Sequence, residues 1–99
     1  MTNRTEILDF LIRNKDFLKK KYNLTKIGLF GSFARGDENK DSDIDIIVEF
    51  EEGTENLFEI KQDLKDYLRK KFNLNIDICR ERYIKPHFKK EILNETIYA

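Results

Sequence analysis

The sequence has very little of three things that would restrict its location or partners: cysteine, long apolar runs and excess charge of either sign. Cys79 is the only cysteine in 99 residues, so no internal disulfide can form. No apolar run approaches the roughly 18 residues of a membrane span, and the first residues lack the apolar core of a signal peptide. Basic and acidic residues number 19 each, so the net charge is zero. These absences favour a cytoplasmic protein that binds neither membranes nor nucleic acid directly.

Repeats, low-complexity tracts and flexible linkers are also missing, so residues 1–99 are expected to form one domain. Apolar residues recur at helical spacing over three ranges, near 4–22, 57–72 and 86–97. Short apolar runs bounded by polar turns predict three strands, near 27–31, 44–50 and 75–80. A helix between the second and third strands implies that these two are parallel, whereas the first two are expected to be antiparallel. The pattern predicts an α/β fold with helices packed on a small mixed sheet of three strands, or of four with one short strand.

The most informative stretch joins the first two predicted strands. Gly31 has no Cβ and allows a close approach of the backbone, and Ser32 would open a short helix whose free N–H groups face an anion. Asp43 and Asp45 are two residues apart on an extended strand, so both carboxylates point to one face. Carboxylates that repel each other in this way suit Mg²⁺, which binds one or two of them together with substrate phosphates. The stretch therefore predicts a phosphate cradle beside a magnesium site.

A third acid interrupts the last predicted strand. Alternation places Ile76 and Ile78 on the core face and Asp77 on the opposite face. A parallel crossover brings the start of this strand to the end of the sheet that holds Asp43. We therefore expect Asp77 to lie close to the other two carboxylates.

These residues resemble those of a known family. Gly31-Ser32, ten further residues and Asp43-x-Asp45 form the signature of the DNA polymerase β-like nucleotidyltransferase superfamily. The chain also resembles the minimal nucleotidyltransferase branch of this superfamily, in its small size and in the sequences Gly-Ser-Phe-Ala-Arg-Gly and Ser-Asp-Ile-Asp-Ile-Ile-Val. Members of that branch often act as antitoxins of HEPN-domain toxins. The resemblance covers nearly the whole chain and implies the nucleotidyltransferase fold.

The resemblance also implies an activity and partners. The chain would transfer AMP from ATP to a hydroxyl, a tyrosine of a HEPN-type toxin, and would act as the antitoxin of a type VII-like pair. A hetero-oligomer with the toxin is expected. Two Mg²⁺ ions would be held by Asp43, Asp45 and Asp77, and Asp77 would also help to deprotonate the acceptor hydroxyl. Three alternatives remain open: an antitoxin that only binds, a subunit of a small-molecule (antibiotic) nucleotidyltransferase, and a nucleic-acid-end transferase.

By the same resemblance, Gly31, Ser32 and Arg35 would bind the nucleotide phosphates. Each further candidate also has an ordinary interpretation. Arg35 could instead pair with Asp37 or Glu38, and the lysine run at 19–21 fits a solvated helix end better than a phosphate contact. His87 is expected to be a surface histidine, and Cys79 a small core residue.

Overall fold

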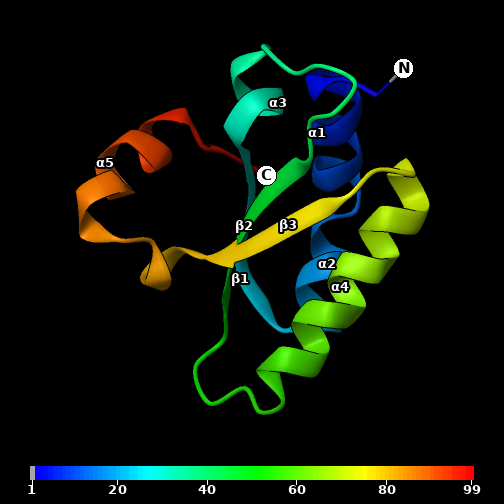
Figure 1. The fold of residues 1–99 in the computed structure, drawn as a ribbon. Coiled ribbons are helices and arrows are strands. Elements are labelled where there is room, and N and C mark those ends of the chain that lie inside the picture. Colours follow the sequence, from blue (N-terminus) through cyan, green and yellow to red (C-terminus); the bar gives the residue numbers. More distant parts are fainter. Residues whose placement is uncertain (1) are drawn as a thin grey trace.

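The computed structural model describes residues 2–99 and contains a four-stranded mixed sheet with helices on both sides (Figure 1). The predicted α/β class is therefore confirmed. In chain order the elements are α1 (Arg4–Arg13), α2 (Lys15–Tyr22), β1 (Leu24–Phe30), α3 (Gly31–Arg35), β2 (Ile44–Phe50), α4 (Leu57–Phe72), β3 (Ile76–Arg80), a 3-10 turn (Glu81–Tyr83), α5 (Pro86–Glu95) and β4 (Ile97–Tyr98). Within residues 2–99, no helix is both long and apolar enough to cross a membrane.

The strand order of the sheet is β3-β2-β1-β4. As predicted, β1 and β2 are antiparallel, and Phe30 lies opposite Asp45. As also predicted, β2 and β3 are parallel, and Asp45 lies opposite Asp77. The end of β1, the start of β2 and the start of β3 therefore meet at one edge of the sheet.

The main core lies between one face of the sheet and the helices α1, α2 and α4. Alternate residues of β2 face this core, and Ile44, Ile46 and Val48 are at most 1% exposed. On β3 the core residues are Ile76 and Ile78. Because strand side chains alternate, the intervening aspartates lie on the opposite face, outside this core.

The prediction of one long helix over residues 4–22 is wrong. The structure has two helices there, α1 and α2, which are separated at Asn14. The Asn14 backbone has φ of −107° and ψ of 12°, which is not helical. The Asn14 side-chain amide donates a hydrogen bond to the Phe10 carbonyl at 2.8 Å, and the Asn14 backbone N–H donates to the same oxygen at 3.0 Å. An asparagine side chain competes for backbone partners in this way and ends a helix that apolar spacing alone would continue.

The predicted helix over 86–97 is also too long. It ends at Glu95, and Ile97–Tyr98 form the short fourth strand, which pairs antiparallel with β1. The pairing depends on Gly28, because a Cβ at that position would lie 3.0 Å from the Ile97 carbonyl oxygen. The first strand differs too: it begins at Leu24 and ends at Phe30, so that Gly31 is the first residue of α3.

Candidate active site

The candidate site begins at Gly31, where β1 turns into α3. Gly31 has a φ of +77°, which favours glycine, and a Cβ there would overlap the Asp45 carboxylate and lie 2.9 Å from Asp45 Cγ. The close neighbour of Gly31 in the structure is therefore the chain's own Asp45 carboxylate, whereas the expected approach of a ligand stays a prediction.

The short helix α3 is held firmly in place. Phe33 and Ala34 are buried, and Arg4 Nη1 donates a hydrogen bond to the Ala34 carbonyl at 3.1 Å. Gly36, with a φ of +82°, ends the helix after five residues, and its N–H donates to the Ser32 carbonyl at 2.9 Å. Ser32 thus lies on a rigid turn at the end of β1, with its side chain half-buried.

Three carboxylates converge next to this turn. Asp45 on β2 and Asp77 on β3 are register partners in parallel strands, so their side chains leave the same face of the sheet. Asp43 precedes β2 by one residue and is exposed. Burial, followed by the charges of Asp77 and Asp43, raises the pKa of Asp45 to about 6. Asp77 and Asp43 are therefore close enough to Asp45 to destabilise the charge of its carboxylate.

The side chains at this site have the oxygen chemistry that magnesium prefers. Within residues 2–99, no three or more carboxylate, imidazole or thiol groups form a ready-made metal cage. Mg²⁺ does not require such a cage, because it keeps several waters and is usually bound by one or two carboxylates and substrate phosphates. An all-oxygen set that includes a half-buried carboxylate with a raised pKa suits a hard cation of this kind.

Sequence reasoning missed one residue at the site, Glu95 at the end of α5. The Gly31 N–H donates a hydrogen bond to Glu95 Oε1 at 3.2 Å, and Arg35 Nη1 donates to Glu95 Oε2 at 3.0 Å. Arg35 Nε also donates to Asp37 Oδ2 at 3.1 Å, so the ordinary pairing expected for Arg35 with Asp37 is present. Glu95 lies 64 residues from Gly31 in the chain, and no motif connects the two.

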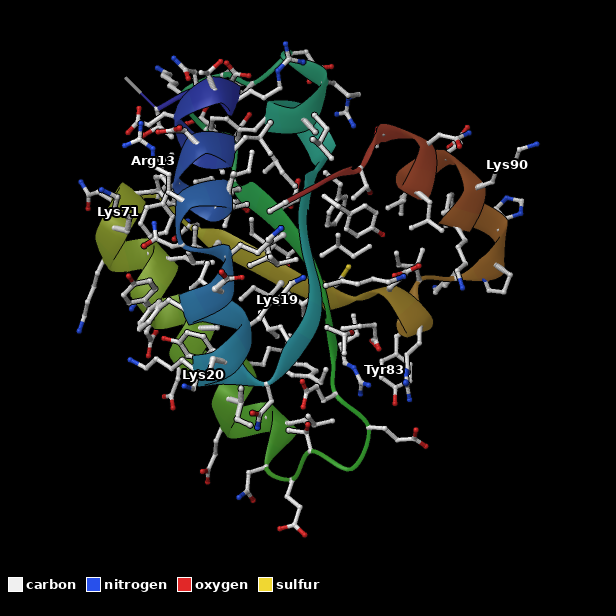
Figure 2. The ribbon with its side chains drawn as sticks, turned by 180° about the vertical axis from the view of Figure 1, so that it is seen from behind. Arg13, Lys19, Lys20, Lys71, Tyr83 and Lys90 are labelled. Carbon is white, nitrogen blue, oxygen red and sulfur yellow. The ribbon has the colours of Figure 1, made fainter. Side chains whose placement is uncertain are left out.

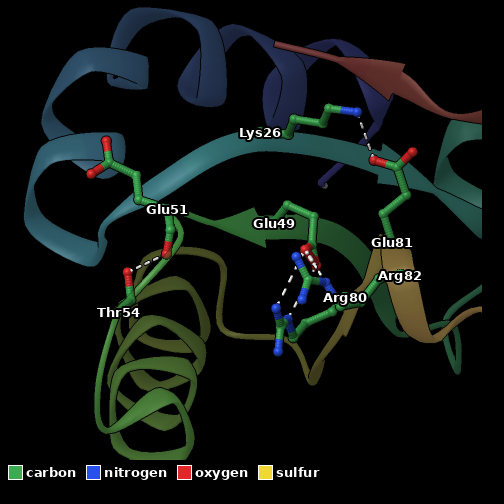
Figure 3. A network of polar contacts seen from close by, with 7 residues as sticks. All are labelled: Lys26, Glu49, Glu51, Thr54, Arg80, Glu81 and Arg82. Carbon is green, nitrogen blue, oxygen red and sulfur yellow. Dashed lines mark hydrogen bonds and ion pairs between the residues drawn. The ribbon is translucent and has the colours of Figure 1, made fainter.

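The opposite end of the sheet holds a separate charged network (Figure 3). Glu49 bridges Arg80 and Arg82 with contacts of 3.1 Å to each, and Lys26 pairs with Glu81 at 2.9 Å. A hollow of about 480 Å³ adjoins Arg80 and Arg82. This hollow is larger than the one that touches Asp77. Its arginines are already paired, however, and none of the motif residues lines it, so we place the chemistry at the carboxylates.

A smaller hollow of about 170 Å³ touches Asp77 directly. Phe58, Lys61 and Lys65 of α4 line it beside β3. Phe58 is 80% exposed, which is unusual for a phenylalanine on a helix that packs against the core. A partner that reaches Asp77 along this side would therefore meet an aromatic ring and two lysines.

The remaining candidates lie away from the carboxylates or differ from expectation. Figure 2 shows Lys19 and Lys20 on α2, well away from the α3 turn, so the lysine run is not part of the site. His87 is exposed, as expected. Cys79 is only half-buried and lies on the same face as Asp77, so its assignment as a core residue is wrong. Burial and the neighbouring Asp77 raise the pKa of its thiol, which makes it less reactive.

Comparison with known proteins agrees with this geometry. The family model of the nucleotidyltransferase domain matches residues 11–99. The protein adenylyltransferase MntA of Thermococcus cleftensis is 35% identical over 99 residues, covering 100% of this chain and 98% of the relative. A protein of Methanocaldococcus jannaschii, provisionally named as a protein adenylyltransferase, is 40% identical over 100% of both chains.

Solved structures show the same fold. A provisionally identified minimal nucleotidyltransferase superposes with a TM-score of 0.78 at 30% identity, covering 97% of this chain and 95% of its own. A toxin–antitoxin complex with AMP-PNP gives a TM-score of 0.67 at 22% identity, covering 87% of this chain and 69% of that one. With the sequence signature, the fold and full-length relatives in agreement, this chain belongs to the minimal nucleotidyltransferase family and is a nucleotidyltransferase.

Proposed function

We propose that this chain transfers AMP from ATP to a tyrosine hydroxyl of a partner toxin and so acts as an antitoxin. The observation that carries the proposal is the register pairing of Asp45 with Asp77 beside the Gly31 turn. This arrangement combines a set of carboxylates with adjacent backbone donors, as nucleotidyl transfer requires. Relatives that match the chain over its full length are named as protein adenylyltransferases, which supports a protein as the acceptor.

In the proposed reaction, the acceptor oxygen forms a bond to the α-phosphorus of ATP, and the bond from that phosphorus to the bridging oxygen breaks to release pyrophosphate. Two Mg²⁺ ions, when bound to Asp43, Asp45 and Asp77, would stabilise charge on the attacking and leaving oxygens. Asp77 would accept the hydroxyl proton, since it is exposed to solvent at the start of β3. Gly31 N–H, Ser32 and Arg35 would bind the leaving phosphates.

A protein acceptor fits this site better than a small molecule. The hollow that touches Asp77 has a volume of about 170 Å³ and is lined by none of Gly31, Ser32, Asp43 and Asp45, so it provides no acceptor pocket at the carboxylates. Pockets for drug-sized ligands typically hold about 300–1,000 Å³. A folded partner brings its own surface and can hold its hydroxyl within the roughly 3–3.5 Å that in-line attack needs.

The toxin partner is proposed from two considerations. The motif resembles that of antitoxins paired with HEPN toxins, and a protein of the same fold was crystallised in a toxin–antitoxin complex with AMP-PNP. AMP attached to a tyrosine near the active site of an RNA-cleaving toxin would add a bulky anion where RNA phosphates must bind. Inhibition would then be both electrostatic and steric, and the two proteins would associate as a hetero-oligomer.

The test uses the protein product of the neighbouring gene as acceptor. We expect its mass to increase by one or more AMP units after incubation with this chain, ATP and Mg²⁺, followed by denaturing separation. Asp43→Asn should abolish the increment, and Asp41→Asn, an exposed acid two residues earlier, should retain it. A toxin that is inhibited but unmodified would show that the chain acts by binding alone and would refute the proposed transfer.

A further inference from the structure

The Glu95 carboxylate occupies the donors that the proposed function assigns to nucleotide phosphates. Its two oxygens each accept one hydrogen bond, from the Gly31 N–H at 3.2 Å and from Arg35 Nη1 at 3.0 Å. We infer that Glu95 competes with the nucleotide for these two donors. The nucleotide must therefore displace the Glu95 carboxylate in order to bind. The inference rests on the proposed function, because it concerns the phosphate positions of the same site.

The surroundings of Glu95 are unfavourable for an ion pair whose role is stability alone. Glu95 is close enough to Asp45 for its charge to contribute to the raised pKa of that carboxyl. A further carboxylate near Asp45 adds repulsion, which the hydrogen bonds that Glu95 accepts from Gly31 and Arg35 offset. A bound triphosphate would offer the same two donors more negative charge and would replace Glu95.

Arg35 does not depend on Glu95 for a partner. Its side chain is 47% exposed and also pairs with Asp37. By contrast, Glu49 and Arg80, at the other end of the sheet, are each only 12% exposed and pair with one another. Breaking the Glu95 contact therefore leaves the Arg35 charge paired with Asp37 and accessible to water, so the cost on the Arg35 side is small.

The attachment of α5 makes such a displacement easy. This helix contributes no fully buried residue, although its end is fixed by the two residue pairs between β4 and β1. The Glu95 side chain can therefore rotate away without disturbing the main core. In Figure 1, α5 lies on the far side of the sheet from α1, α2 and α4.

The test measures binding, so it does not depend on transfer to any acceptor. Isothermal titration with Mg²⁺ and AMP-PNP, and separately with inorganic triphosphate, compares the wild-type chain with Glu95→Gln. Charge-assisted hydrogen bonds of this kind imply about tenfold tighter binding of both probes once the competing charge is removed. Glu91→Gln removes the same charge from an exposed position one turn earlier on α5 and should change the Kd by less than about twofold.

A second variant keeps the inference testable if Glu95→Gln folds poorly. Glu95→Asp keeps the charge but shortens the reach of the carboxylate, so it should bind the probes with an affinity between those of the wild type and Glu95→Gln. In the wild type, the Gly31 amide resonance should shift when triphosphate replaces Glu95. Equal or weaker probe binding by Glu95→Gln would overturn the inference and leave the nucleotide site intact. If neither protein binds AMP-PNP at millimolar concentration, both the inference and the proposed function are refuted.

Discussion

Replacing Asp45 with asparagine should stabilise the metal-free protein while it abolishes nucleotidyl transfer. Asparagine has the size of aspartate but no charge, so it removes the cost of holding a half-buried carboxylate beside Asp77 and Asp43. Most substitutions destabilise a protein, so a gain in stability at a residue of the motif would be a distinctive result.

The size of the effect follows from the pKa of Asp45, which rises from 3.8 to about 6. At about 1.4 kcal/mol for each pKa unit the upper limit is about 3 kcal/mol, and solvent screening of a partly exposed group reduces it to about 1–2 kcal/mol. For a domain of this size, this corresponds to a rise in Tm of about 5–15 °C.

The sign of the pH dependence is fixed by the direction of the shift. Because the folded state holds the Asp45 proton more tightly than the unfolded state, the stability that this group contributes is complete below pH 3.8 and is lost as the pH rises through about 6. Asparagine does not titrate in this range. The Tm difference between Asp45→Asn and the wild type should therefore be close to zero near pH 4 and largest at pH 7.

The assay is thermal unfolding followed by circular dichroism in EDTA at pH 4, 5, 6 and 7. Asp41→Asn, in the exposed loop before β2, is the control and should show no such trend. A Tm difference that stays constant between pH 4 and pH 7, or a variant that is less stable at pH 7, would refute the electrostatic reasoning.

Three further predictions concern Gly31, the Glu49 network and nucleotide binding. Gly31→Ala, which requires a Cβ at positive φ against Asp45, should lower the free energy of unfolding by about 1–3 kcal/mol in urea titrations and abolish transfer; full activity would contradict the close packing described. Glu49→Gln leaves Arg80 and Arg82 without a full counter-charge and should cost about 1–3 kcal/mol in the same titration, yet transfer should persist because this network lies at the other end of the sheet. Finally, ATP with Mg²⁺ should raise the Tm of the wild type more than ATP with EDTA, since a ligand of the folded state stabilises it by mass action; identical melting curves at millimolar nucleotide would argue against the site.

The sequence alone predicts which strand residues face the core better than it predicts the ends of the helices. Alternation on β2 and β3 correctly places Asp45 and Asp77 on the face opposite the core, because a period of two leaves only two choices once the apolar face is known. The break at Asn14 is not visible in the apolar spacing, since it depends on a side-chain hydrogen bond to Phe10. The contact from Glu95 to Gly31 is equally hidden, because it depends on where β4 pins the end of α5.

The loose attachment of α5 also gives the fold an uneven distribution of stability. Segments with few buried apolar contacts open locally at a lower free energy than the strands and helices that enclose the core. Backbone amides of α5 should therefore exchange with deuterium much faster than those of α4, in which Leu64 and Leu68 are completely buried. Opening of α5 would carry Glu95 away while β1, β2 and β3 keep Gly31, Asp45 and Asp77 in register. The end of the sheet that holds the candidate site thus belongs to a part that opens at high free energy, whereas Glu95 belongs to a helix that opens at a lower one.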